Sequence, residues 1–311
     1  MVRNRALVLG LTVMLVLGLL VTGCAPKTAP APGPSGPKTY TIGVSLSGLN
    51  HPFFVDVKSG IDAKAKELGV KVIVTDAQDN TSKQISDIED LITKKVDAII
   101  LNPTDSAAVV PAVEKANAAN IPVITVDRAA NGGKVATHIA SDNVQAGKMA
   151  ADVIIKALNG KGKVIELQGI AGSSAARDRG QGFDDEIKTA AGIQIVAQQP
   201  ADFARAKGLS VMENLLQAHP DVDAVFGHND EMVLGAIEAM KSKLAGKKVV
   251  VVGVDAIDDA VKAINDGTMT ATVGQKPKLM GEMAIENALK VLKGEKVDAF
   301  IGVPLDLITK K

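Results

Sequence analysis

Val96-Asp-Ala-Ile-Ile-Leu-Asn102 is a short apolar run that ends in a polar residue, and it recurs later as Val222-Asp-Ala-Val-Phe226, with Asn229 just beyond. A second run, Pro122-Val-Ile-Thr-Val-Asp127, recurs as Val250-Val-Val-Gly-Val-Asp255. In each case roughly 126 to 128 positions separate the copies, and self-similarity at a fixed offset indicates a repeated structural unit. We therefore predict two similar lobes of roughly 130 residues each.

Short β-rich runs alternate with helix-length stretches from Thr41 onward. In one such stretch Val57, Ile61, Ala65 and Leu68 recur at helical spacing, which predicts one apolar helix face. This alternation predicts an α/β protein with doubly wound parallel sheets and helices on both faces. The expected strands are 41–47, 70–76, 96–102, 121–127 and 136–141, then 163–169, 194–198, 222–227, 248–255 and 271–275.

Polar residues close several of these strands. Asn102, Asp127, Asn229 and Asp255 all fall at or just past a predicted strand end. Ligands of open parallel sheets bind outside the carboxyl ends of the strands. Two lobes that present such ends to each other predict a cleft lined with hydrogen-bonding side chains.

The composition narrows the functional classes. Hydrophobic residues make up 46% of the 311 residues and charged residues 23%, as in soluble globular proteins. When Arg3 and Arg5 near the amino terminus are left out, the chain has 33 basic and 35 acidic side chains. There is therefore no basic excess that would favour binding of nucleic acid. One cysteine excludes an internal disulfide, and the four histidines lack metal-ligand spacing. We predict no metal and no cofactor.

The first 38 residues are typical of an export signal and a tether. A positive start is followed by the charge-free apolar run 6–21 and by Val21-Thr-Gly-Cys24, which resembles the bacterial lipoprotein signal. Residues 1–23 would then be the signal peptide, and Cys24 the lipidated first residue. An ordinary signal peptide with an incidental cysteine is the alternative. Residues 24–38 carry five of the 13 prolines and predict an extended tether. We expect a lipid-anchored protein outside the cytoplasm, in a periplasm or on the outer face of the cell membrane.

The cleft residues have the chemistry that a sugar requires. Sugar hydroxyls both donate and accept hydrogen bonds, and Asp127-Arg128 supplies an acceptor beside a guanidinium fork. Sugar C–H faces are apolar and lie on aromatic rings. The chain has only six Phe, one Tyr and no Trp, so the run Asn50-His-Pro-Phe-Phe54 after the first strand is informative.

Several segments resemble the bacterial ribose-binding proteins, the extracytoplasmic receptors of sugar ABC transporters. The resemblance covers residues 39–311 in order and is more specific than a likeness of fold. The segments that carry it are Leu49–Phe54, Ile100–Asp105, Ile121–Arg128, His138–Asn143, Val164–Gly172, Ser174–Gly180, Gln199–Phe203, His219–Asp221, Asn229–Met232 and Val291–Lys296.

The resemblance implies a type I periplasmic binding protein fold, with two lobes joined by a three-segment hinge. The implied lobes are 39–141 plus 276–304, and 142–275 plus 305–311. The implied aromatic contacts are Phe53, Phe54 and Phe203. The implied hydrogen-bonding contacts are His51, Asp127, Arg128, Arg179, Asn229, Asp255 and Gln275.

One position departs from the family pattern. The ribose type has Asn-Asn-Pro-Phe-Phe, and here His51 replaces the second Asn. A neutral imidazole still donates one bond to a hydroxyl, so ribose stays plausible. The replacement also introduces a group whose ordinary pKa lies near neutrality, and with it a pH dependence of binding.

Single residues also have structural interpretations. Taken alone, Pro52-Phe53-Phe54 at a strand-to-helix junction is more often core than pocket. Asp127 and Asp255 are also compatible with turn caps. Of the two arginines near a predicted helix start, the resemblance favours Arg179 as the contact and Arg177 as a surface residue. Structural or surface roles are expected for His138, His219 and His228.

We predict a monomeric receptor that captures D-ribose and delivers it to ABC permease subunits by hinge closure, with a chemoreceptor as a further candidate partner. Allose, xylose, galactose or a furanose signal are alternative ligands. A lactose-repressor-type regulator would need a helix-turn-helix, which residues 1–38 do not resemble. A secreted sugar-acting enzyme would need paired carboxylates, for which Asp127 and Asp255 are the candidates.

Overall fold

The computed structural model describes residues 39–244 and 246–310. The predicted signal peptide, Cys24 and the tether lie outside these residues. Within the described ranges, no helix is both long and apolar enough to cross a membrane.

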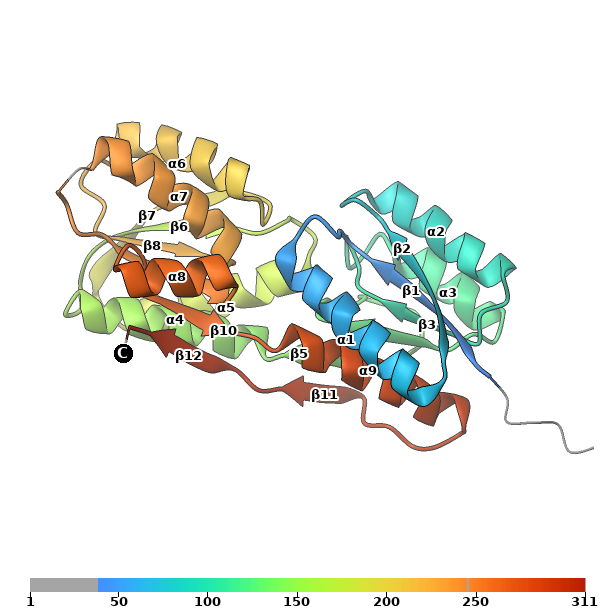
Figure 1. Cartoon of the computed structure of the whole chain (residues 1–311). Coiled ribbons are helices and arrows are strands. Elements are labelled where there is room, and N and C mark those ends of the chain that lie inside the picture. The colour runs from blue at the N-terminus through green and yellow to red at the C-terminus, as the bar shows by residue number, and fades with distance from the viewer. Residues whose placement is uncertain (1–38, 245, 311) are drawn as a thin grey trace, which may run out of the picture. The chain divides into compact units, whose positions relative to one another are not determined.

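The first lobe is built on a six-stranded parallel sheet (Figure 1). Its strands lie in the order β11 (Phe300–Val303), β5 (Val135–Ser141), β4 (Val123–Val126), β3 (Ala98–Leu101), β1 (Thr41–Leu46) and β2 (Lys71–Asp76). One apolar cluster joins the sheet to α1 (Pro52–Leu68) and α9 (Pro277–Leu292), and another joins it to α2 (Thr81–Thr93) and α3 (Val110–Ala118). The helices therefore cover both faces.

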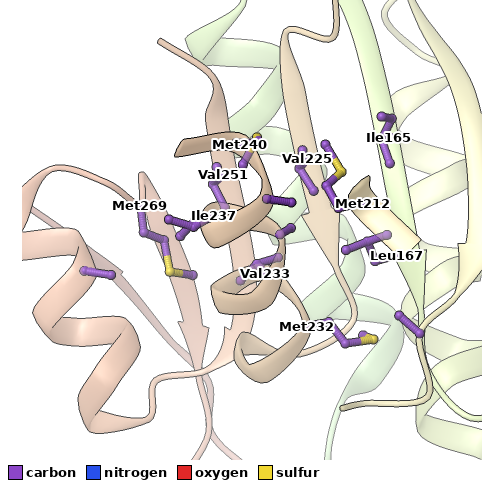
Figure 2. Close-up of a cluster of buried hydrophobic side chains, with 14 of the residues drawn as sticks. Ile165, Leu167, Met212, Val225, Met232, Val233, Ile237, Met240, Val251 and Met269 are labelled. Carbon is purple, nitrogen blue, oxygen red and sulfur yellow. The ribbon is translucent and has the colours of Figure 1, made fainter. Parts of the chain in front are cut away.

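The second lobe repeats this plan. Its strands lie in the order β12 (Asp306–Thr309), β10 (Ala271–Gly274), β9 (Val250–Asp255), β8 (Ala224–Gly227), β6 (Lys161–Gln168) and β7 (Gly192–Pro200). Only β12 runs antiparallel in this sheet. One face packs on α4 (Asn143–Ala157) and α5 (Ser174–Ile187). The other packs on α6 (Arg205–Ala218), α7 (Asp230–Lys243) and α8 (Asp258–Asp266), where methionines fill much of the core (Figure 2).

The predicted fold class is confirmed. The repeated runs of the sequence form β3 and β4 in one sheet and β8 and β9 in the other, at equivalent places in the strand order. The chain passes between the sheets three times: after β5, after β10, and between β11 and β12.

Three helix pairs pack closely because glycines meet at their crossings. A Cβ atom on Gly60 of α1 would lie 2.0 Å from the carbonyl oxygen of Lys278, and one on Gly281 of α9 would lie 2.1 Å from that of Val57. The same reciprocal arrangement joins α4 to α5 through Gly147 and Gly182, and α6 to α7 through Gly208 and Gly235.

Two details differ from the sequence predictions. The ten expected strands all form, but β11 and β12 were not predicted because they lack the buried apolar run of the other short strands; Phe300 is 51% exposed and Leu307 45%. Leu68 was predicted to be buried and is 42% exposed. It is the last residue of α1, where left-handed Gly69 ends the helix, and the buried face lies further toward the N-terminus.

Candidate functional site

The structure brings all ten predicted site residues into one pocket. An eleventh residue, Ala175, also lines it; it was not predicted, because a methyl group carries no hydrogen-bonding signal. The ten are His51, Phe53, Phe54, Asp127, Arg128, Arg179, Phe203, Asn229, Asp255 and Gln275.

Strand ends of both sheets position these side chains. Asp127 follows β4, Asn229 lies between β8 and α7, and Asp255 is the last residue of β9. Asp127 and Asp255 have φ values of 62° and 125°, and Phe203, before α6, has 59°. Non-glycine residues rarely adopt such conformations, which persist where the surrounding structure holds them and which cluster at functional sites.

The Arg128 guanidinium is held between aromatic rings. Its Cζ lies 5.1 Å from the ring centre of Phe54 and 5.2 Å from that of Phe203. Nη1 donates to the carbonyl of Pro103 at 3.4 Å, and Nε lies 3.8 Å from Oδ2 of Asp127. The rings thus hold the cation in place beside the Asp127 carboxylate.

Arg179 is fixed by hydrogen bonds within the second lobe. Its Nε donates to Oδ1 of Asn143 at 2.8 Å and its Nη1 to the carbonyl of His228 at 2.7 Å. Nη1 also lies 4.0 Å from Oδ1 of Asp255. The side chain is buried, so it places a fixed positive charge at the pocket wall.

The Asp255 carboxylate is buried, and burial disfavours its charged form. It accepts a bond from Nε2 of Gln275 at 2.8 Å. Burial raises the pKa of Asp255 to about 7, although Arg179 and the Gln275 bond act in the opposite direction. A carboxylate that is kept in place at this cost is typical of a functional site.

Two buried polar atoms of the pocket have no hydrogen-bond partner among the described residues, Nε of Arg128 and Oε1 of Gln275. One is a donor and the other an acceptor. A buried polar group without a partner is unfavourable by about 1–3 kcal/mol. A hydroxylated ligand, whose groups both donate and accept, would satisfy both atoms.

His51 begins α1 and is held neutral. Its Nδ1 accepts from the Phe53 amide at 3.2 Å, and its Nε2 lies 2.7 Å from Nδ2 of Asn229. Burial, together with the charges of Arg128 and Arg179, lowers the pKa of His51 to about 3. The expectation that His51 introduces a titration near neutral pH is wrong.

The residues expected to be structural lie around the pocket rather than in it. Arg177 pairs with Asp178 at 3.1 Å on the exposed side of α5. His138 contacts Oγ1 of Thr125 at 2.9 Å, and Nε2 of buried His228 contacts Glu166 at 2.6 Å. Arg179 lines the pocket and Arg177 does not; the role of Arg179 as a ligand contact stays a prediction.

A buried amide supports the Asp127 side of the pocket. Nδ2 of Asn102 donates to the carbonyl of Val126 at 3.0 Å and to Oδ2 of Asp127 at 3.3 Å. Asn102 thus orders the strand end without lining the pocket. In residues 39–244 and 246–310, no group of three His, Cys, Asp or Glu side chains is arranged to hold a metal ion.

Comparisons with known proteins agree with this geometry. Residues 42–296 match the family described as a periplasmic binding protein domain. The ribose import binding protein RbsB of Bacillus subtilis (strain 168) is 51% identical over 304 residues, which is 96% of this chain and 98% of that protein. RbsB of Escherichia coli (strain K12) is 52% identical over 272 residues, 87% and 91% of the two chains.

Among solved structures, the Caulobacter myo-inositol binding protein bound to myo-inositol superimposes with a TM-score of 0.84 and 34% identity. The match covers 90% of this chain and 96% of that chain. The fold is thus shared with a protein that binds myo-inositol.

Proposed function

Because this chain belongs to the periplasmic binding protein family, we propose that it is an extracytoplasmic receptor that captures D-ribose in the pocket described above and delivers it to an ABC importer. The observation that carries the proposal is the pocket itself. It combines aromatic faces, charged partners and two unpartnered polar atoms. The assignment to ribose rests on the two ribose import binding proteins described above, each more than 50% identical to this chain.

The polar groups suit the hydroxyls of a sugar. Asp127 and Asp255 accept hydrogen bonds, Arg128 and Arg179 donate them, and Gln275 does both. Bonds to ionised groups contribute about 1.5–3 kcal/mol each, more than bonds between neutral groups. Several such bonds account for tight binding of a ligand that would otherwise remain in water.

The aromatic groups suit the C–H faces of the ring. Phe53 and Phe54 meet edge to face with centroids 5.3 Å apart, and Phe203 lies across the pocket on the second lobe. All three are buried. A sugar ring packed against these rings would bury apolar surface while its edge meets the charged side chains.

Capture requires the lobes to open. Apart from His51, which is partly exposed, the pocket side chains are at most 8% exposed, so a ligand reaches them only when the lobes move apart. Contacts near the pocket join the lobes: Ser106 donates its amide to the carbonyl of Gly172 at 3.0 Å, and Ser174 donates its amide to Oγ of Ser106 at 3.2 Å. We propose rotation about the three crossing segments, with bound sugar favouring the closed arrangement.

The remaining parts of the proposal concern partners and location. The closed lobes would present a joint surface to the permease subunits, with a chemoreceptor as a second candidate partner and the receptor itself a monomer. Cys24 would be acylated after removal of residues 1–23, and residues 24–38 would hold the body away from the membrane. Labelling cells with a radioactive fatty acid tests this: the wild-type protein should carry label in the membrane fraction, and Cys24→Ala should carry none.

A thermal-shift and calorimetry panel with ribose, allose, galactose, glucose, xylose and arabinose tests the ligand. A sugar at about 1,000 times its dissociation constant adds roughly 4 kcal/mol of stability. We expect the largest shift with ribose. A larger shift with another sugar would reassign the ligand, and no shift with any of them would contradict the proposed function. A dye must report unfolding, because the chain has no Trp.

Two arginines of α5 provide a matched pair of variants. Arg179→Ala removes a buried pocket cation and should weaken ribose binding at least about tenfold, as expected for a bond from a charged group. Arg177→Ala removes an exposed arginine two residues away and should leave the affinity unchanged. Equal affinities of the two variants would contradict the site assignment.

A further inference from the structure

A second carboxylate lies behind the pocket. Asp230 is the first residue of α7, is 0% exposed and does not line the pocket, so ligand binding as described above does not use it. It follows the pocket residue Asn229 directly and packs against β9, where a Cβ on Gly253 would lie 2.3 Å from its Oδ1. A buried carboxylate is unfavourable unless hydrogen bonds compensate for its burial.

The bonds of Asp230 converge on the turn after Asp255. Its Oδ2 accepts from the Ile257 amide at 3.0 Å, and its Oδ1 accepts from Oγ1 of Thr272 at 2.7 Å. The same Thr272 oxygen accepts from the Ala256 amide at 3.2 Å. Together Asp230 and Thr272 thus bind both amides that follow the pocket residue Asp255.

The backbone of the turn at Asp255 and Ala256 has an unfavourable conformation that needs supporting contacts. Asp255 has a φ of 125° and Ala256 a φ of 62°, conformations that residues with a Cβ rarely adopt. Such backbone persists only where the surrounding structure fixes it. If the two amides lost their partners, the turn would relax and the Asp255 carboxylate would lose its orientation toward the pocket.

Asp230 also suits its partners better than an amide would. The Ile257 amide and the Thr272 hydroxyl both donate to it, and a carboxylate is an acceptor at both oxygens. Asparagine would present an NH₂ group to one of these two groups, and the bond that this group now donates would be lost.

We propose that Asp230 is a positioning residue for ligand binding: together with Thr272 it holds the turn 255–257 so that the Asp255 carboxylate faces the ligand. This inference rests on the proposed function, because it assigns Asp255 to sugar recognition. Asp230 contacts no ligand and acts only through Asp255.

Variants of Thr272 and Asp230, measured by calorimetry with ribose on the purified protein, test the inference. Thr272→Val keeps the shape but removes the hydroxyl, and should weaken ribose binding about tenfold, as should Asp230→Asn, since each leaves a buried donor without a partner. Thr272→Ser keeps the hydroxyl and should restore the affinity. If Thr272→Val fails to fold, Asp230→Asn provides the same measurement.

A matched control separates positioning from stability. Oγ1 of Thr270, at the other end of the same strand pair, accepts from the Val251 amide at 3.1 Å. Thr270→Val should lower the melting temperature much as Thr272→Val does, yet leave the ribose affinity unchanged. Equal losses of affinity in both variants would overturn the positioning role.

A double-mutant cycle tests whether the effect passes through Asp255. In the Asp255→Asn background, adding Thr272→Val should cause no further loss of ribose affinity, because the group it positions has already been changed. Independent, multiplying losses would overturn the inference. If the wild-type protein binds no ribose, both the proposed function and the inference fail. If it binds ribose and Thr272→Val does not alter the affinity, only the inference fails.

Discussion

In the proposed function, the ligand binds to Asp255, but the Asp255 carboxylate makes the unliganded fold less stable. The carboxylate is buried and its pKa is raised to about 7 by that burial, despite Arg179 and Gln275. Asparagine has nearly the same shape and carries no charge. We predict that Asp255→Asn weakens ribose binding and at the same time stabilises the unliganded protein at alkaline pH.

The magnitude follows from the pKa. Asp255 titrates from 3.8 in the unfolded chain and at about 7 in the folded one. Between pH 3.8 and about 7 the folded chain binds more protons than the unfolded chain, so the free energy of unfolding falls as the pH rises through this range. Above about pH 7 the loss caused by this group stays constant. At 1.36 kcal/mol per pKa unit, the loss in the wild type reaches about 4 kcal/mol. Asp255→Asn lacks this loss.

Urea unfolding of the unliganded proteins at pH 4, 6 and 8 provides the assay. The free energy of unfolding of the two proteins should be close at pH 4, and the variant should exceed the wild type by up to about 4 kcal/mol at pH 8. Calorimetry should show ribose binding weakened by about 1.5–3 kcal/mol, the contribution of a charged hydrogen bond. The reasoning would be refuted if the free energies of unfolding of the two proteins changed with pH in parallel, or if the variant were less stable than the wild type at pH 8.

Three further predictions concern single sites. His51 has a pKa of about 3, so ribose affinity between pH 5 and 8 should follow the same curve in the wild type and in His51→Asn; a step near pH 6.5 in the wild type alone would contradict this. A Cβ on Gly169 would lie 2.1 Å from Cζ of Phe203, so Gly169→Ala should displace the ring and weaken ribose binding in a folded protein, and unchanged affinity by calorimetry would count against Phe203 as a contact. Gly60→Ala would place a Cβ 2.0 Å from the carbonyl oxygen of Lys278. It should lower the free energy of unfolding by about 1–3 kcal/mol, the usual effect of overpacking, and this loss should be measured as a lower melting temperature. An unchanged melting temperature would show that α1 and α9 separate easily.

The fold class and the position of the site could be predicted because the sequence patterns that indicate them each lie within a few residues. Runs such as 96–102 and 250–255 show strand length, buried character and a polar last residue within a few positions. Parallel strands bring their carboxyl ends to one edge of a sheet, so Asp127 and Asp255 could be assigned to a cleft. The choice between Arg177 and Arg179 was less local and depended on the family resemblance.

Other features depended on residues far apart in the sequence. The strands β11 and β12 have weak patterns of their own and form because β5 and β10 offer them an edge. The neutral state of His51 results from burial and from Arg128 and Arg179, which are distant along the chain.

The sequence by itself determined the two-lobed α/β plan and the chemical types that meet at the strand ends, since periodicity and residue type are written locally. Only the tertiary structure decided how each side chain behaves there. It shows that Asp230, which follows Asn229 directly, accepts hydrogen bonds from the Ile257 amide and from the Thr272 hydroxyl behind Asp255. Hydrogen-bond partners, burial and the pKa of a group depend on which distant segments the fold packs around it, and that packing is not a property of any short stretch of chain.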